Sequence, residues 1–249
     1  MSRGSRESEF QFAHERLTWA VHTLILMNVL ALATQLVLDV PFGGRGILGG
    51  QIARWLAFSP SGFVHGAVWT ALTYMFLHSG IMHLFFNMLS LYFFGPDVER
   101  ALGTQQFYRY FVICGAGGVL LNLLQLFADP HTPIIGASGA TLGVLVAFAM
   151  IAPERQIFLF PIPVPINARA LVLIIVVMNF VAALGPESGT SWLTHFGGMG
   201  VGYLYMKYRP KFTAWQDSRR KAAGPSKKDM EKLGDEINNI LKFHNKEHE

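Results

Sequence analysis

Ser138 is a serine whose surroundings suit nucleophilic chemistry. It lies in the run Gly136-Ala137-Ser138-Gly139, and only 14 residues separate it from Pro153. At about 1.5 Å per residue, a helix of that length covers roughly 21 Å of the roughly 30 Å hydrocarbon core of a bilayer. If Pro153 marks one membrane face, the hydroxyl lies well inside the other face. Because a serine hydroxyl reacts once a base removes its proton, this position predicts nucleophilic chemistry within the membrane.

His195, His83 and Asn87 are polar residues in apolar segments that would meet Ser138 at one depth. Counted from the cytoplasmic ends of three parallel helices, the four groups lie about 15–22 Å up. His83 and Asn87 are four positions apart and therefore share a helix face. A neutral imidazole can accept the serine proton near pH 7. Asn, His and the Ser138 backbone N–H can donate to the oxyanion of a tetrahedral intermediate.

Each of these residues also has an ordinary structural explanation. A serine at a glycine-rich helix start can cap or pack, and His or Asn can hydrogen-bond between membrane helices. Their common depth, with no Asp or Glu in any predicted span, favours a site. The same absence excludes aspartyl chemistry and leaves no carboxylate to orient His195. The hypothesis is therefore a Ser138–His195 dyad.

The sequence favours neither a metal nor a cofactor. His-Glu-x-x-His, the pattern of a zinc protease, does not occur. His78 and His83 are five positions apart, about 140° around a helix, so they do not share a face as two ligands should. The single cysteine, Cys114, lies in an apolar segment and cannot form an internal disulfide.

The composition is that of a membrane protein with several spans. Of the 249 residues, 51% are hydrophobic and 14% are charged, and the mean hydropathy is +0.34. A soluble domain carries about 25% charged residues. We expect six transmembrane helices, which are placed at about 17–38, 79–95 (ending at Gly95-Pro96-Asp97), 105–126, 138–152, 168–184 and 193–207. These spans predict an all-α membrane domain over residues 17–207.

Lys and Arg are distributed unevenly between the connectors. They occur in residues 1–16, in the connectors 96–109 and 153–169 and in the tail from Lys207, but not in 127–137 or 185–192. This bias predicts that both termini are cytoplasmic. It also accounts for the net charge of +4, so nucleic acid is not an expected partner. The apolar run 17–38 is too long for a signal-peptide core, so we expect it to remain as the first span.

Two segments outside the spans have distinct compositions. The 39–78 connector is rich in Gly and then aromatic, with Trp55 and Trp69 among others. It is expected to be a structured loop partly submerged in the membrane interface, and an ordinary extracellular loop is the alternative. Residues 208–249 form a basic cytoplasmic tail. Apolar residues at helical spacing in this tail predict a short amphipathic helix over 227–243, which would dock a partner or lie on the membrane: Met230, Leu233, Ile237 and Leu241.

Paired glycines flank both proposed catalytic residues. Gly139 and Gly143 are four positions apart, as are Gly198 and Gly202. Small residues at this spacing let membrane helices approach closely. We therefore expect the fourth and sixth spans to touch and to bring Ser138 to His195.

Over about residues 65–207, the chain resembles the rhomboid family of intramembrane serine proteases. The matching patterns are Gly136-x-Ser138-Gly139, His195-x-x-Gly198-x-x-x-Gly202, His78-x-x-x-x-His83-x-x-x-Asn87 and Gly95-x-x-x-Glu99-x-x-x-Gly103. The resemblance implies a six-helix bundle with a water-filled cavity open to the outside. It implies that Ser138 is the nucleophile and His195 the base. It also implies an oxyanion hole of His83, Asn87 and the Ser138 amide, a supporting role for His78 and a structural one for Glu99.

Two positions depart from the family pattern. Many members have Tyr or Phe four residues after the serine, stacked on the catalytic His, and here this residue is Leu142. A Trp-Arg pair in the first loop of some members is Trp69-Thr70 here. Neither departure touches the catalytic groups. The six-span layout, with no extra span expected before or after it, resembles the basic bacterial form and implies the bacterial inner membrane.

The resemblance implies membrane-anchored substrates that have helix-weakening segments and a small residue at the cut, and that reach the site beside span five. A non-catalytic relative that binds membrane clients is the alternative, but such proteins lack the Ser or the His. A channel or transporter function is not supported, because no charged residue lies deep within a predicted span, where it would line a pathway.

Overall fold

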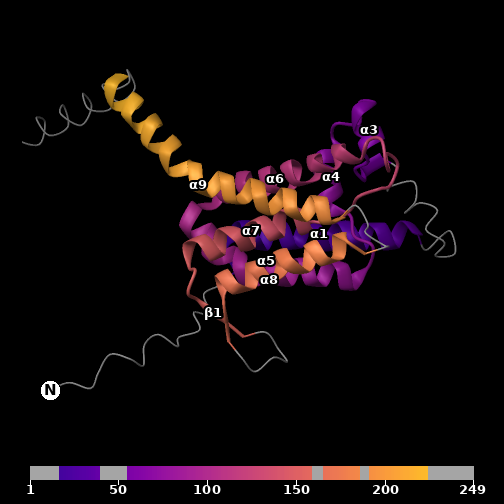
Figure 1. The fold of residues 1–249 in the computed structure, drawn as a ribbon, viewed down its shortest axis with the longest axis horizontal. Coiled ribbons are helices and arrows are strands. Elements are labelled where there is room, and N and C mark those ends of the chain that lie inside the picture. Colours follow the sequence, from indigo (N-terminus) through magenta and orange to yellow (C-terminus); the bar gives the residue numbers. More distant parts are fainter. Residues whose placement is uncertain (1–16, 40–54, 159–164, 186–190, 224–249) are drawn as a thin grey trace, which may run out of the picture. The chain divides into compact units, whose positions relative to one another are not determined.

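The structure is a computed structural model that describes residues 17–39, 55–158, 165–185 and 191–223. In chain order its elements are α1 (Trp19–Asp39), α3 (Pro60–Val64), α4 (Thr70–Thr73), η2 (Tyr74–Phe76), α5 (Ile81–Leu102), α6 (Thr104–Leu120), η3 (Leu121–Gln125), α7 (Ser138–Ile151), β1 (Gln156–Ile157), β2 (Ile166–Asn167), α8 (Ala168–Ala183) and α9 (Ser191–Ala223). The chain divides into two units, Met1–Tyr205 and Met206–Glu249. The helices of the first unit form a bundle (Figure 1), and every candidate site residue lies within this unit.

The helices α1, α5, α6, α7, α8 and α9 lie at the six predicted spans. Two described helical stretches, Trp19–Leu38 and Thr104–Gln125, are long and apolar enough to cross a bilayer, and α7 and α8 are shorter apolar helices. The number of six spans therefore stays a prediction. The short antiparallel pairing of β1 with β2 was not predicted. The predicted segments 1–16 and 227–243 lie outside the described residues.

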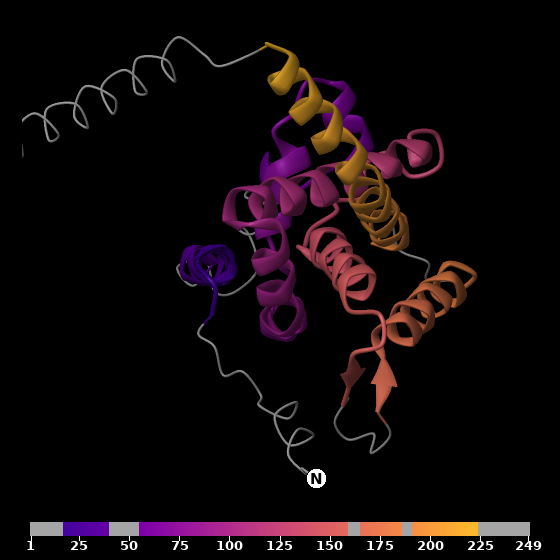
Figure 2. The same ribbon diagram turned by 90° about the vertical axis from the view of Figure 1, so that its left-hand side faces the viewer.

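The central helix of the bundle is α7, which packs against α5, α6 and α8 (Figure 2). Most of its residues are buried, because it is apolar on all sides and has no polar face to turn outward. The surrounding helices instead bury one stripe and expose apolar side chains on the other. On α5, for example, Leu84, Met88 and Leu91 are buried, whereas Phe86 and Phe93 are each 61% exposed. Large exposed apolar faces of this kind fit a lipid environment.

The helix α5 does not end at Gly95-Pro96-Asp97, where the second span is predicted to end. Pro96 lies inside the helix, which continues to Leu102. Proline removes one helix N–H, but buried contacts beyond it hold the last turns in place. The buried carboxylate of Glu99 accepts hydrogen bonds from the backbone N–H groups of Ala20 and Val21, at 3.1 and 3.0 Å. These N–H groups lie in the first turn of α1 and have no partner within it, so Glu99 caps α1.

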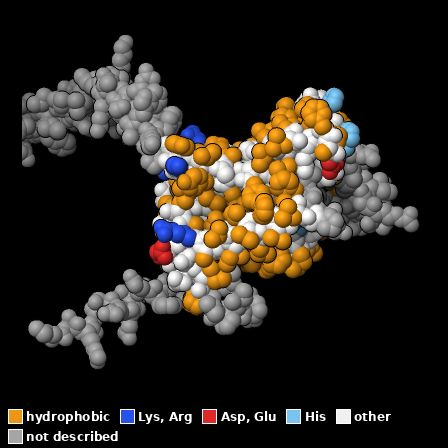
Figure 3. Space-filling view, in the orientation of Figure 1, with side chains coloured by type: hydrophobic (Ala, Val, Ile, Leu, Met, Phe, Trp, Pro, Cys, Tyr) orange, Lys and Arg blue, Asp and Glu red, His pale blue; other side chains and the backbone are white. Residues whose placement is uncertain are grey.

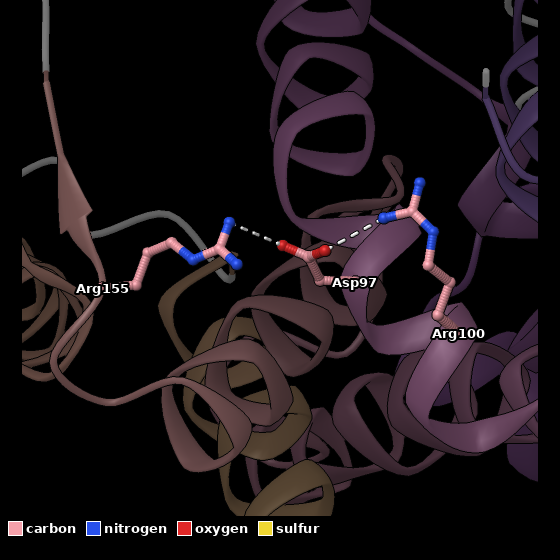
Figure 4. A network of polar contacts seen from close by, with 3 residues as sticks. All are labelled: Asp97, Arg100 and Arg155. Atoms are coloured by element: carbon pink, nitrogen blue, oxygen red, sulfur yellow. Dashed lines mark hydrogen bonds and ion pairs between the residues drawn. The ribbon is translucent and has the colours of Figure 1, made fainter. Parts of the chain in front are cut away.

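Charged side chains gather where α5 and α7 end and α8 begins. Asp97 accepts a hydrogen bond from Arg100 at 3.1 Å and forms an ion pair with Arg155 at 3.3 Å (Figure 4). Arg169 pairs with Glu154 at 3.0 Å. On the face that Figure 3 shows, apolar side chains gather away from this end. Exposed ion pairs stabilise little, but a charged end next to an apolar band fits a membrane boundary. Ser138 begins α7 at the opposite end.

Glycines bring three helices together backbone to backbone. A Cβ on Gly198 of α9 would collide with the carbonyl oxygen of Gly139 on α7. A Cβ on Gly202 would lie 3.1 Å from the Cα of Gly143. This contact between α7 and α9 is the one that the glycine spacing predicts. Gly118 of α6 also joins, since a Cβ there would lie 2.9 Å from the backbone nitrogen of Gly198. The role of α6 was not predicted.

Residues 55–76 fold into short helical pieces before α5 begins. Several of their apolar side chains are exposed: Trp55, Val64, Val68, Trp69 and Leu72. The indole N–H of Trp69 donates to the carbonyl oxygen of Trp55 at 2.8 Å, so the two tryptophans lie close together. The described part of the connector is therefore structured, with an aromatic surface that suits a membrane interface.

Candidate active site

The turn before α7 is held by the first connector. Phe58 and Ile134 exchange backbone hydrogen bonds of 3.1 and 2.7 Å, and the Gly136 N–H donates to the carbonyl oxygen of Tyr74 at 2.9 Å. Gly136 has φ +115°, a conformation that residues with a Cβ rarely adopt. The chain can therefore turn sharply and begin a helix at Ser138.

Ser138 and His195 are brought within hydrogen-bonding distance. The Oγ of Ser138 lies 2.7 Å from the Nε2 of His195. Ser138 is the first residue of α7, and His195 is in the second turn of α9. The glycine contacts between these helices allow this approach, because no side chain separates the two backbones there. Ser138 and His195 are both half-buried.

The first turn of α7 supplies backbone donors beside the Ser138 hydroxyl. The first α-helical bond of this turn runs from the Thr141 N–H to the Ala137 carbonyl oxygen at 2.9 Å. The N–H groups of Ser138, Gly139 and Ala140 precede it and have no acceptor within the helix. A helix N-terminus of this kind stabilises negative charge, so the Ser138 amide is placed to donate to an oxyanion.

The His83 ring lies against the turn that leads to Ser138. A Cβ on Gly136 would be 2.7 Å from both Cε1 and Nε2 of His83, so only glycine leaves room for the ring. On the other side of the ring, Nδ1 lies 3.1 Å from the Ser79 hydroxyl and 3.4 Å from the Ser79 backbone N–H. A backbone N–H can only donate, which makes Nδ1 the acceptor and leaves Nε2 carrying the proton. The Nε2–H therefore faces the nucleophile's turn.

Asn87 is buried and tied to α7. Its Nδ2 donates to the His83 carbonyl oxygen at 2.9 Å, and its Oδ1 accepts from the Thr141 hydroxyl at 3.2 Å. Thr141 is three residues after Ser138. The second hydrogen on Nδ2 is available to another acceptor, because an amide nitrogen carries two.

His78 and Leu142 are placed less directly. His78 is 3% exposed, more enclosed than the half-buried His83, and the two rings meet edge to face with centroids 5.0 Å apart. Neither ring nitrogen of His78 has a hydrogen-bond partner among the described residues. Leu142 is half-buried on α7, one turn after Ser138. Its expected position beside the His195 ring stays a prediction.

Sequence reasoning missed Asn179, a neighbour of His195. The Oδ1 of this α8 residue lies 2.6 Å from the Nδ1 of His195. It also missed a buried bond next to His195, from the Asn122 Nδ2 to the Thr194 hydroxyl at 2.8 Å. An asparagine in an apolar helix gives no signal of its partner. The only available clue was that Asn179 is the single strongly polar residue of the fifth span after Arg169 at its start.

The arrangement is suited to acyl transfer. It combines a hydroxyl, an adjacent imidazole and several N–H donors around one helix start. Among the residues that the structure describes, no group of three His, Cys, Asp or Glu side chains could hold a metal ion.

Two described helical stretches are long and apolar enough to cross a bilayer, which fits a membrane protein. The family model of the rhomboid domain matches residues 65–211, and the chain belongs to the rhomboid family. It is 34% identical over 154 residues to "Rhomboid protein 1, mitochondrial" of Saccharomyces cerevisiae, which covers 60% of this chain and 44% of the relative. It is 39% identical over 95 residues to "Rhomboid protease GluP" of Bacillus subtilis, covering 38% of this chain and 18% of the relative. It is 29% identical over 163 residues to "RHOMBOID-like protein 4" of Arabidopsis thaliana, covering 64% and 38%. The chain therefore spans less than half the length of each of these relatives.

Proposed function

We propose that the protein is an intramembrane serine protease that cuts a peptide bond in or near the transmembrane segment of membrane-anchored proteins. The observation that carries the proposal is the 2.7 Å approach of the Ser138 Oγ to the His195 Nε2 at the start of α7. Family membership and the name of the relative GluP as a protease support it.

The chemistry proceeds in two halves. His195 Nε2 takes the Ser138 proton as Oγ attacks the carbonyl carbon of the substrate. The resulting oxyanion accepts hydrogen bonds from the Ser138 amide, His83 Nε2–H and Asn87 Nδ2–H. His195 then returns its proton to the leaving amine, and an acyl-enzyme on Ser138 remains. His195 then takes a proton from a water molecule as the water oxygen attacks the acyl carbon, and it returns this proton to Ser138 Oγ as the ester bond breaks and the second product leaves.

The membrane setting follows from the same reading. In the proposed setting both termini lie in the cytoplasm and the six helices span the bacterial inner membrane, with residues 55–76 in the outer interface. Ser138 then lies below the outer face, and substrates reach it beside α8.

A serine-directed fluorophosphonate tests the nucleophile. The Ser138 oxygen would displace fluoride and gain a phosphonyl adduct, and tandem mass spectrometry would locate it. We expect the adduct on Ser138 in the wild type and none on that peptide in His195→Ala. An adduct elsewhere, or equal labelling without His195, would contradict the proposal.

The alternative is a non-catalytic rhomboid that binds membrane clients. Such a protein has no need for a serine and an imidazole at bonding distance. The pairing of Ser138 with His195 therefore favours the protease.

A further inference from the structure

We propose that Asn179 is a positioning residue that fixes the tautomer and the orientation of His195. This inference deepens the proposed function and rests on it. His195 makes two hydrogen-bonding contacts, one from each ring nitrogen. Nε2 lies 2.7 Å from Ser138 Oγ, and Nδ1 lies 2.6 Å from Asn179 Oδ1. The imidazole is thus held between α7 and α8, and the site has three members rather than two.

The orientation of the Asn179 amide is set by its own helix. Its Nδ2 donates to the carbonyl oxygen of Ile175 at 2.8 Å. A flipped amide would place Oδ1 against that carbonyl, and two acceptors would face each other. Oδ1 must therefore point at His195 and accept a hydrogen bond. It follows that Nδ1 carries the proton and that Nε2 presents its lone pair to the serine, as a general base requires.

This bond serves the proposed reaction in two ways. It restricts rotation of the ring, and its oxygen dipole stabilises the imidazolium that forms when the serine proton arrives. A neutral amide does this without an ionised carboxylate inside the membrane, which would be costly there. Asn179 also supplies restraint at a site where Leu142 offers no aromatic ring to stack on the imidazole.

The hydrogen bond between Asn179 and His195 also links the helices α8 and α9. The buried residues of α8, Ala168 and Leu171, lie near its start, and the ion pair between Arg169 and Glu154 lies there too. Farther along, Met178 and Val181 on either side of Asn179 are 64% and 61% exposed. Among the described residues of α8, none after Leu171 is buried, and the bond from Asn179 to His195 links the second half of this helix to α9. The placement of α8 then sets the orientation of the catalytic base.

Simple helix bonding is the competing explanation, because asparagines often join membrane helices. Asn28 on α1 is a matched control for it. Asn28 is buried, and its Nδ2 donates to the Leu24 carbonyl oxygen at 2.8 Å, as Asn179 does to Ile175. Its Oδ1 has no hydrogen-bond partner among the described residues. Asn28→Leu removes an equivalent side-chain amide and an equivalent bond to the helix backbone, at a position outside the site.

The test uses the full chain in proteoliposomes with a model transmembrane substrate. Asn179→Leu is expected to lower kcat about 10–100-fold, as loss of a bond that orients a histidine does elsewhere. KM should change little, and fluorophosphonate labelling should slow in parallel. Asn179→Asp in its protonated form keeps an oxygen that accepts from His195 Nδ1 and an O–H that donates to the Ile175 carbonyl, so it should recover most of the lost kcat. Asn28→Leu should leave kcat unchanged.

A tautomer measurement decides the question independently of turnover. Protein labelled with 15N-histidine would be compared by NMR with His195→Gln, which identifies the His195 signals. The wild type should carry its proton on Nδ1, and Asn179→Leu should lose this preference. An unchanged kcat in Asn179→Leu, or a wild-type His195 protonated on Nε2, would overturn the inference. If the wild type cleaved and labelled nothing, the proposed function would fail, and the NMR result would still decide the role of Asn179.

Discussion

The Ser138 hydroxyl oxygen and the His195 Nε2 lie 2.7 Å apart although 57 positions separate them in the chain. Their approach depends on the contact between α7 and α9, where the Gly139 carbonyl oxygen occupies the space that a Cβ on Gly198 would need. The catalytic geometry and the packing of the two helices are thus one structural feature. Substitutions that separate the helices should therefore affect stability and turnover together, whereas substitutions at the donors should affect turnover alone.

Asn87→Ala tests the oxyanion donors. Loss of one donor should lower turnover by about one to three orders of magnitude. Labelling by a fluorophosphonate should slow but persist, because the nucleophile and base remain. Asn87 also accepts from Thr141, so Thr141→Val is the control that removes this link and keeps the amide. If Thr141→Val lowered kcat as much as Asn87→Ala, the asparagine would act only by joining α5 to α7.

Gly198→Ala tests the helix contact. The added methyl would meet the Gly139 backbone, which cannot move aside as a flexible side chain can. We expect a loss of about 1–3 kcal/mol in stability, as overpacking generally causes, together with reduced cleavage. Gly200 on the same helix has open space around its Cβ position, so Gly200→Ala should leave the melting temperature and turnover unchanged. Equal melting temperatures for the two variants would contradict the packing described for α7 and α9.

Glu99→Gln tests the cap on α1. The carboxylate accepts from two backbone N–H groups and from the Thr104 hydroxyl, at 2.8 Å. A glutamine would turn an N–H₂ group toward at least one of these donors and leave it unsatisfied. Thermal unfolding in detergent should show a loss of about 1–3 kcal/mol. Glu154→Gln changes an exposed carboxylate that is 70% accessible and should have almost no effect. The cap would be unimportant if both variants melted with the wild type.

Leu142→Phe tests the departure from the family pattern. A ring one turn after Ser138 would stack on the His195 imidazole and change turnover about two- to tenfold, the equivalent of about 0.5–1.5 kcal/mol. Overpacking opposes this gain, so the direction of the change is left to the measurement. Leu145→Phe, at a residue only 2% exposed, should instead lower the melting temperature. A fall in melting temperature with unchanged turnover for Leu142→Phe would place this residue away from His195.

The positions of several helices could be predicted from local sequence patterns. The lengths and apolar character of α1, α7 and α8 follow from runs bounded by polar residues, Gly and Pro, and the helix starts and ends agree within a few residues. The end of α5 could not be found in this way. Pro96 is a local signal for a helix end, but the helix continues because Glu99 is bound to the start of α1, a partner 79 positions away.

In the candidate site, too, some residues could be predicted from the sequence and others could not. Residues in glycine-rich runs or at matching depths, such as Ser138 and His195, could be paired from the sequence. Asn179 could not, because its role depends on the rotation of α8 about its axis and on the ring that it faces. The position of His83 against Gly136 likewise depends on how α5 meets the turn before α7.

The most direct test of Ser138 as the nucleophile compares cleavage of a transmembrane substrate by purified wild type and Ser138→Ala. Both proteins would be reconstituted in proteoliposomes at equal amounts, with a substrate whose products are resolved by mass. We expect products from the wild type that carry one new terminus in or near the membrane segment. Ser138→Ala, with an unchanged melting temperature, should give no more product than liposomes without protein. Cleavage by Ser138→Ala above that background would show that Ser138 is not the nucleophile.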